Sequence, residues 1–243
     1  MYETCIFDLY GTLVNIHTDE KKRDLWEKMA LFYGYQGAYY EPEGLQKDWE
    51  RLVNEMQESC SHHRKNEQQE YPEINMETVF SILFERKGVC VDSKLIAYTG
   101  QFFRAMSTDY VQLYDGTKEM LKTLKEHGKQ VYLLTNAQRI FTRPEICLLH
   151  IDSYFDGIFI SSEHGYKKPD LRFYEELLRT YHISRKTAVM VGNDRICDVE
   201  GAKRAGLSTL YIHTELSTGG EIPKADHVLR QMDMKKVTDI LLS

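Results

Sequence analysis

Side chains that could act as a nucleophile, a cation ligand or an anion-binding group follow short apolar segments of this 243-residue sequence. Asp8 comes first, between the apolar tripeptide Cys-Ile-Phe and a Gly-Thr turn. The others are, in chain order, Thr135, Asn136, Lys168, Asp194 and Asp198. Carboxylates, a hydroxyl and an ammonium, brought together, can hold a cation, bind an anion and supply a carboxylate nucleophile.

A parallel sheet would bring these residues together. Short apolar runs bounded by turn or polar residues predict buried parallel strands, at residues 4–7, 130–134, 157–160, 188–191, 209–212 and, more weakly, 227–229. Helical periodicity lies between them, at residues 117–127, 140–149, 170–181 and 198–205. Strands that alternate with helices predict an α/β protein with a doubly wound parallel sheet. Ligands of such a sheet bind beyond the carboxyl ends of its strands, where these side chains stand.

The first predicted strand does not lead directly into a crossover helix. After Leu13 we find no convincing strand until the alternation resumes at residue 113, and helical runs lie at residues 19–32, 44–64, 75–87 and 93–107. We expect this block to be an inserted, cap-like domain. The predicted division is a catalytic core of residues 1–15 and 109–243 and an all-helical cap of residues 16–108.

Four sequence elements in this order, each just beyond a strand or at the start of a helix, resemble the four motifs of the haloacid dehalogenase superfamily. The resemblance covers about residues 1–15 and 110–243, and the helical block lies where the cap of that superfamily commonly enters. It implies a Rossmann-like core and a hydrolase that uses an aspartate nucleophile.

The resemblance also implies a role for each residue. Asp8 matches the nucleophile, which attacks phosphorus or a halogen-bearing carbon and forms a covalent ester. Thr135 matches the hydroxyl that orients the nucleophile and the transferring group, and Asn136 follows it. Lys168, directly before a proline, matches the lysine that offsets negative charge on nucleophile and substrate. We expect its neighbour Lys167 to be exposed.

Mg²⁺ is the cofactor that the resemblance implies. Its ligands would come from Asp8, the backbone carbonyl of Tyr10, Asp194 and Asp198, because hard oxygen ligands beside a phosphate suit this ion. Asp198 alone could instead be an acidic residue that the helix dipole favours. Without a cation, Asp194 would place a second negative charge near Asp8 and raise the pKa of one of the two carboxyls.

Tyr10 departs from the pattern of the superfamily phosphatases. These usually have a second aspartate two residues after the nucleophile, which protonates the leaving group and then activates the attacking water. Tyrosine has an ordinary pKa near 10, so Tyr10 would be a poor base at neutral pH, although its hydroxyl could donate a proton. The sequence Asp-x-Tyr-Gly-Thr resembles instead the L-2-haloacid dehalogenases, whose halide leaving group needs no proton and which work without metal.

Two reactions therefore stay open. Asp194 favours a Mg²⁺-dependent phosphatase of a small phosphorylated metabolite, because those dehalogenases have uncharged residues in this loop. Tyr10 and, weakly, Tyr174 favour a metal-independent 2-haloacid dehalogenase. That enzyme would need a cap arginine for the substrate carboxylate, and the candidates are Arg23, Arg51 and Arg64. A third alternative is a binding scaffold with little turnover. A phosphatase without an aspartate at position 10 is expected to favour acyl and aryl phosphates over sugar phosphates.

The composition argues against nucleic acid or a membrane as a partner, and we expect a small-molecule substrate. The net charge of −6 leaves no basic footprint for nucleic acid, and the short basic cluster at residues 62–65 is interpreted as a solvated face. No segment is apolar enough to cross a membrane. The five cysteines lack metal-ligand spacing and are expected to be reduced, mostly buried thiols of a cytoplasmic protein. The sequence leaves the oligomeric state open.

Overall fold

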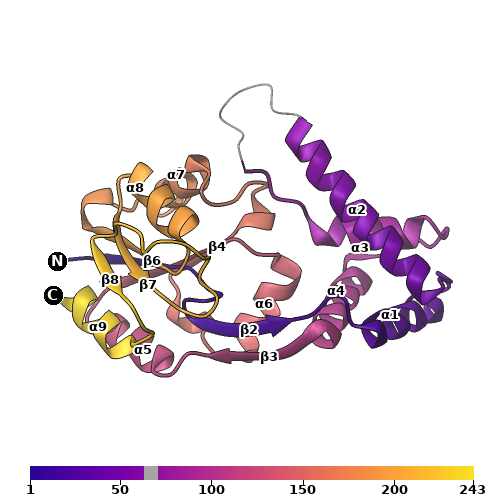
Figure 1. Cartoon of the computed structure of the whole chain (residues 1–243), viewed down its shortest axis with the longest axis horizontal. Helices are drawn as coiled ribbons and strands as arrows, with labels where there is room; N and C mark the ends of the chain where they lie inside the picture. Colours follow the sequence, from indigo (N-terminus) through magenta and orange to yellow (C-terminus); the bar gives the residue numbers. More distant parts are fainter. Residues whose placement is uncertain (63–70) are drawn as a thin grey trace.

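The structure is a computed structural model that describes residues 1–62 and 71–243 (Figure 1). Residues 63–70 and the side chains of residues 60–62 lie outside the described part. The predicted basic cluster at residues 62–65, including Arg64, therefore lies outside it as well.

A six-stranded parallel sheet, in the order β5-β4-β1-β6-β7-β8, lies at the centre of the larger part of the molecule. The strands are β1 (Thr4–Phe7), β4 (Gln130–Thr135), β5 (Gly157–Ile160), β6 (Ala188–Gly192), β7 (Ser208–Ile212) and β8 (His227–Leu229). The predicted doubly wound α/β fold is confirmed, and each strand agrees with its predicted range to within one residue. Phe7 of the central strand pairs with Leu133 on one side and Val191 on the other.

Helices cover both faces of this sheet (Figure 1). They are α5 (Thr117–Glu126), α6 (Arg139–Leu148), α7 (Leu171–Thr180), α8 (Gly201–Arg204) and α9 (Met234–Leu242), with a π-helical turn at Arg195–Glu200 and short 3-10 turns at Asp152–Tyr154, Ser161–Glu163 and Arg185–Thr187. Alternate residues of β1 point to opposite faces: Cys5 and Phe7 pack with α5, α6 and α9, and Ile6 packs with α7 and α8. Burial on both faces explains the continuous apolar runs of the strands.

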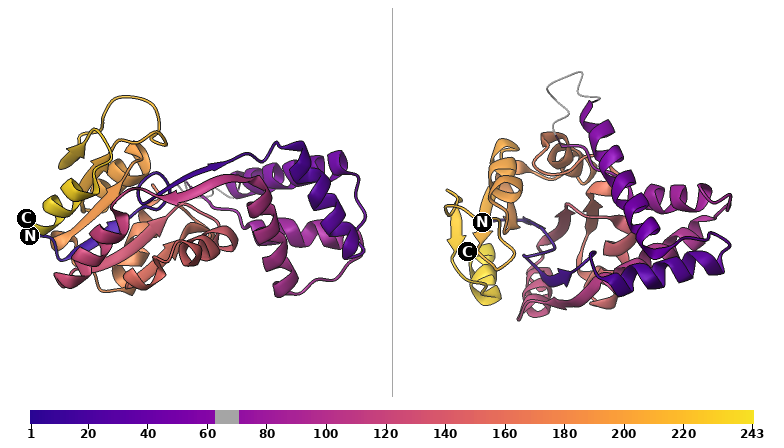
Figure 2. Two further views of the ribbon diagram at one scale, coloured as in Figure 1. Left: turned by 90° about the horizontal axis from the view of Figure 1, so that it is seen from below. Right: turned by 45° about the vertical axis from the view of Figure 1, so that its right-hand side comes forward.

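The helical insertion lies beyond one end of the sheet (Figure 2). Its helices are α1 (Arg23–Tyr35), α2 (Pro42–His62), α3 (Met76–Glu85) and α4 (Ser93–Ser107). Their bounds lie within four residues of the predicted ranges, and those of α4 are the same. Trp26, Trp49, Phe80 and Phe103 pack together at the centre of the insertion, and Phe141 of α6 joins the same cluster. The apolar interior of the insertion is therefore continuous with one core helix.

Two strands connect the insertion to the core, so the expectation of no strand between Leu13 and residue 113 is wrong. β2 (Val14–Thr18) and β3 (Thr108–Leu113) form an antiparallel pair. Both are short and largely half-exposed or exposed, which gives them only a weak alternation of apolar and polar residues. The predicted domain boundaries fall at this pair, and the division into two domains stays a prediction.

The cysteines differ from the expectation that most are buried. Cys5 is buried and Cys197 is half-buried, but Cys90 and Cys147 are exposed, and all four are free thiols. None of the described helices is long and apolar enough to cross a membrane.

Candidate active site

Asp8 lies at the carboxyl end of the central strand, where the backbone turns sharply. Its N–H donates to the carbonyl of Val191 on β6 at 2.9 Å, which holds it at the edge of the sheet. Three residues later Gly11 adopts a φ of +83°, and a Cβ there would lie 2.3 Å from the side-chain nitrogen of Asn193. Only glycine fits this turn without displacing Asn193. The turn thereby presents a buried carboxylate, 8 % exposed, to the space beyond the sheet.

The ammonium of Lys168 bridges two carboxylates. Its Nζ lies 2.7 Å from Oδ1 of Asp8 and 2.7 Å from Oδ1 of Asp198. Burial alone would lower the pKa of Lys168, but Asp198 and Asp8 together raise it above its ordinary value. Lys168 is thus a fixed cation beside the candidate nucleophile. Its neighbour Lys167 is half-exposed and lies 3.7 Å from Glu73 instead.

Asp198 serves here as a partner of Lys168. Its second oxygen, Oδ2, accepts the N–H of Asp194 at 2.9 Å, and a Cβ at Gly192 would lie 2.2 Å from its carboxyl carbon. Burial raises the pKa of Asp198 to about 7, although Lys168 opposes this shift. Both carboxylate oxygens already accept hydrogen bonds, so its assignment as a metal ligand stays a prediction.

Asp194 caps the π-helical turn through one of its carboxylate oxygens. Its Oδ1 accepts the N–H groups of Ile196 at 2.8 Å and Cys197 at 2.6 Å, which is the geometry of a helix cap. Its Oδ2 accepts neither of these two backbone hydrogen bonds, and Asp194 lines the same pocket as Asp8. Asp194 therefore offers one carboxylate oxygen to the pocket, as the predicted metal ligand would.

Thr135 is the last residue of β4 and Asn136 directly follows it, and their side chains have different environments. The side chain of Asn136 donates to the carbonyl of Lys168 at 2.9 Å and accepts the Lys168 N–H at 2.8 Å. Asn136 thus holds the backbone that carries the ammonium. The hydroxyl of Thr135 is buried and has no hydrogen-bond partner in the described structure. A buried polar atom of this kind costs about 1–3 kcal/mol unless a ligand satisfies it.

All the predicted site residues line one pocket of about 160 Å³. Its lining consists of Asp8, Tyr10, Thr135, Asn136, Lys168, Asn193, Asp194, Cys197, Asp198 and Leu216. Among the described residues, no group of three or more His, Cys, Asp or Glu side chains could by itself hold a metal ion. The donor set that fits Mg²⁺ is smaller, because this ion commonly takes one or two carboxylates, substrate phosphate oxygens and water. Asp8 and Asp194, which both line the pocket, would be those two carboxylates if the predicted ion binds here.

The side chain of Tyr10 is engaged away from the predicted nucleophile. Its hydroxyl donates to a carboxylate oxygen of Glu145 on α6 and lies 3.1 Å from Oγ1 of Thr142. Glu145 in turn accepts Nε–H of Arg104, from α4, at 2.6 Å. Burial, reinforced by the charge of Glu145, raises the pKa of Tyr10 far above its ordinary value. The hydroxyl that could have donated a proton to a leaving group is therefore committed to Glu145.

Sequence reasoning missed several of the residues around Asp8. The Thr12 hydroxyl lies 3.2 Å from Oδ1 of Asn193 and 3.5 Å from Oδ2 of Asp8. Asn193 also donates to Oγ1 of Thr214 at 3.4 Å, and Thr214 donates to the Gly11 carbonyl at 3.0 Å. The position of Thr12 in the Gly-Thr turn, and of Asn193 beside Asp194, was the available signal. Glu145 could have been noticed because it is an acidic residue among the apolar positions of a predicted helix.

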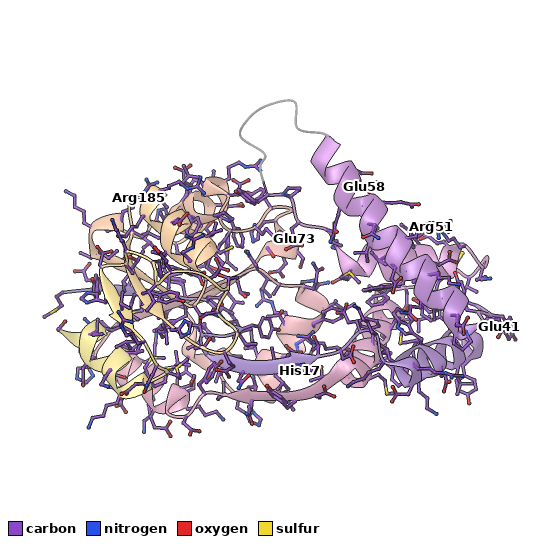
Figure 3. All side chains as sticks on the ribbon, viewed as in Figure 1. His17, Glu41, Arg51, Glu58, Glu73 and Arg185 are labelled. Carbon is purple, nitrogen blue, oxygen red and sulfur yellow. The ribbon has the colours of Figure 1, made fainter. Side chains whose placement is uncertain are left out.

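Two of the arginines considered for a dehalogenase, Arg23 and Arg51, lie away from the pocket. Arg23 pairs with Glu27 and Arg51 with Asp48, both on exposed helix surfaces, and neither arginine lines the pocket. Figure 3 places Arg51 on α2, in the helical insertion. Tyr174 is fully buried, and its hydroxyl donates to the backbone carbonyl of Cys197. Tyr174 therefore packs behind the π-helical turn.

Comparisons with known proteins show what this chain resembles in sequence and in fold. Residues 2–206 match the family model of the haloacid dehalogenase-like hydrolases. The chain is 24 % identical over 213 residues to the glyceraldehyde 3-phosphate phosphatase of Pyrococcus abyssi, covering 87 % of this chain and 81 % of that protein. It is 26 % identical over 172 residues to the pyrimidine 5'-nucleotidase PynA of Streptococcus pneumoniae, covering 66 % and 71 %. A 2-haloacid dehalogenase from Pseudomonas syringae pv. tomato has a similar fold, with a TM-score of 0.65, 20 % identity and coverage of 100 % and 99 %.

Proposed function

The chain belongs to the haloacid dehalogenase-like hydrolases, and on that basis we propose that it is a Mg²⁺-dependent phosphatase of a small phosphorylated metabolite, with Asp8 as the nucleophile. The two relatives compared by sequence, a glyceraldehyde 3-phosphate phosphatase and a pyrimidine 5'-nucleotidase, support a small phosphorylated substrate.

The charge of the pocket is the observation that carries this proposal. Three carboxylates, those of Asp8, Asp194 and Asp198, line it with one ammonium, that of Lys168. Even with Asp198 protonated, two carboxylates face one cation. A phosphate dianion would be repelled from such a pocket unless a further cation entered with it. A divalent cation removes that repulsion.

The residues available for Mg²⁺ are Asp8, Asp194 and the backbone carbonyl of Tyr10. The matching side-chain donors are Oδ2 of Asp194, which accepts neither backbone hydrogen bond of the helix cap, and Oδ2 of Asp8, which lies 3.5 Å from the Thr12 hydroxyl. When bound, the ion would neutralise phosphoryl charge and polarise the phosphorus centre. Asp198 would keep Lys168 in place beside it.

The protein groups can carry out the covalent step. A carboxylate oxygen of Asp8 attacks phosphorus, and the bond to the leaving oxygen breaks, which leaves an aspartyl phosphate. The ammonium of Lys168 offsets the charge shared by Asp8 and the phosphoryl group. The unpartnered hydroxyl of Thr135 donates to a phosphoryl oxygen. Water then attacks the aspartyl phosphate, which releases phosphate and restores Asp8.

Proton transfer is the weak part of this arrangement and determines the substrate class. The Tyr10 hydroxyl is bonded to Glu145, and burial raises the pKa of Cys197 well above its ordinary value. Neither group suits proton transfer at neutral pH. We therefore propose acyl or aryl phosphates, whose leaving groups depart without a proton, as better substrates than sugar phosphates.

A metal-independent 2-haloacid dehalogenase is the second candidate. Tyr10 favours it, since a halide leaving group also needs no proton. The described insertion, however, brings no arginine into the pocket to bind a substrate carboxylate. Chloride release from 2-chloropropionate, unchanged by a chelator, would support this alternative.

The first test is hydrolysis of p-nitrophenyl phosphate by the wild-type protein and by Asp8→Asn. We expect Mg²⁺-dependent hydrolysis that the substitution abolishes. Hydrolysis by Asp8→Asn at the wild-type rate, or at the same rate with a chelator, would refute the proposal.

A further inference from the structure

Glu73 contacts the core from the helical insertion, although it does not line the catalytic pocket. It stands just before α3, and Figure 3 places it between α2 and the sheet layer. β2 and β3 are the covalent connections of the insertion to the core. Glu73 belongs to a separate, non-covalent connection. It meets the core close to two catalytic loops, namely the one that follows β4 and the one that leads from β5 to Lys168.

The backbone around Glu73 pairs with the loop that leads to Lys168. Pro72 forms an antiparallel bridge with Tyr166. On either side of this bridge, the Glu73 N–H donates to the carbonyl of Gly165 at 3.0 Å, and the Lys167 N–H donates to the carbonyl of Tyr71, also at 3.0 Å. The second of these hydrogen bonds is made by the residue directly before Lys168.

The carboxylate of Glu73 is nearly buried, at 9 % exposure, and joins the same loop to the one after β4. Its Oε2 accepts the hydroxyl of Ser161 at 2.8 Å, and its Oε1 accepts the side-chain N–H of Gln138 at 3.3 Å. Lys167 lies 3.7 Å away as its counter-charge. The Ser161 hydroxyl oxygen also accepts the N–H of Ala137 at 2.9 Å. A buried carboxylate needs such partners to be tolerated.

These contacts converge on the two loops that hold the catalytic groups. Ala137 and Gln138 directly follow Thr135 and Asn136, and Asn136 is bonded to both backbone polar groups of Lys168. We infer that Glu73 is a positioning residue, supplied by the insertion, that fixes Thr135 and Lys168 relative to Asp8. The inference rests on the proposed function, because it assigns Glu73 to the same reaction.

The test compares Glu73→Gln with a matched carboxylate, Glu77→Gln. Glutamine keeps the shape of Glu73 but loses the charge opposite Lys167. Its amide N–H group can also face the side-chain N–H of Gln138, which now donates to the Glu73 carboxylate. The carboxylate of Glu77 also crosses from the insertion to the core, where it pairs with Arg139 at 2.6 Å. It contacts neither catalytic loop.

With p-nitrophenyl phosphate and Mg²⁺, we expect Glu73→Gln to lower kcat by about tenfold to a hundredfold, in the range known for groups that orient catalytic residues. We expect KM to change by less than about twofold, because Glu73 does not line the pocket. Glu77→Gln should leave both constants near the wild-type values. Equal losses of kcat in the two variants would overturn the inference, since any insertion–core contact would then have the same effect.

Ser161→Ala provides a second variant that acts through the same contact. If Glu73 acts through Ser161, the double variant should lose no more kcat than the more damaging single variant. Independent, multiplying losses would contradict this route.

Amide hydrogen exchange separates this inference from the proposed function. In the full chain, Glu73→Gln should speed exchange at the amides of residues 73 and 167, and Glu77→Gln should not. A wild-type protein that hydrolyses no phosphate ester would refute the proposed function, and exchange alone would then decide whether Glu73 holds the loop. Unchanged exchange in Glu73→Gln would overturn the inference.

Discussion

The hydroxyl of Tyr10, two residues after Asp8, donates a hydrogen bond to the buried carboxylate of Glu145 on α6. Glu145 is held on its other side by Arg104, from the helical insertion, at 2.6 Å. Superfamily phosphatases usually have an acid–base aspartate at this position. Here the side chain is hydrogen-bonded to Glu145 and takes no part in proton transfer. Only the backbone of Tyr10 is left to act at the pocket.

This arrangement predicts a strong dependence of rate on the leaving group. Across a series of aryl and alkyl phosphates, kcat/KM should fall steeply as the pKa of the leaving alcohol rises, because no protein group protonates it. Tyr10→Phe should leave the slope of that plot unchanged. A flat plot would mean that some group does protonate the leaving alcohol, and a slope that steepens in Tyr10→Phe would identify that group as the Tyr10 hydroxyl.

Lys168→Met is expected to lower kcat by about a hundredfold to a thousandfold, the range for removal of one preorganised electrostatic group. The variant also leaves the carboxylates of Asp8 and Asp198 without the ammonium that lies 2.7 Å from each. Steady-state hydrolysis of an aryl phosphate measures the effect. Lys122→Met is the control, since Lys122 lies on α5 with an exposed side chain and pairs with Glu126. Similar rates for the two variants would contradict the role of Lys168.

Thr135→Val should change stability and activity in opposite directions. Valine replaces the buried, unpartnered hydroxyl with a methyl group of similar size, so the free energy of unfolding should rise by about 1 kcal/mol. The same change removes a donor to the phosphoryl group and should lower kcat by about a hundredfold. Urea unfolding and aryl phosphate kinetics provide the two measurements. Thr135→Ser, which keeps the hydroxyl, should retain most of the activity. A Thr135→Val protein that is both stable and fully active would show that the hydroxyl contacts no substrate.

Arg104→Met should destabilise the protein by about 3 kcal/mol, because it leaves the buried Glu145 without its cation. Thermal unfolding checks this result. Arg23→Met, which removes an exposed ion pair on α1, should leave Tm unchanged. Equal Tm values for the two variants would contradict a structural role of the Arg104–Glu145 pair.

The central sheet could be predicted from the sequence because its strands are buried on both faces. β1, β5 and β8 have their predicted bounds, and Asp8 and Asp194 were found because they stand one and two residues beyond the ends of strands. β2 and β3 were missed because short, half-exposed strands lack a continuous apolar run.

Contacts between distant residues could not be predicted from local pattern. The partner of Tyr10, Glu145, lies 135 residues away in the sequence, and the partner of Glu73, Ser161, lies 88 residues away. Nothing near Tyr10 in the sequence indicates that its hydroxyl points toward α6. The fully paired carboxylate of Asp198 is likewise a result of tertiary packing around Lys168.

The covalent intermediate tests the central claim most directly. The wild-type protein would be mixed with p-nitrophenyl phosphate and Mg²⁺, stopped in acid, digested and analysed by mass spectrometry. We predict one phosphoryl group on the peptide that carries Asp8, formed only with Mg²⁺ and accompanied by a burst of p-nitrophenol, because no side chain at position 10 is placed to activate the water of the second step. Hydrolysis that proceeds without any phosphoryl group on Asp8, or with the group on another residue, would contradict the account.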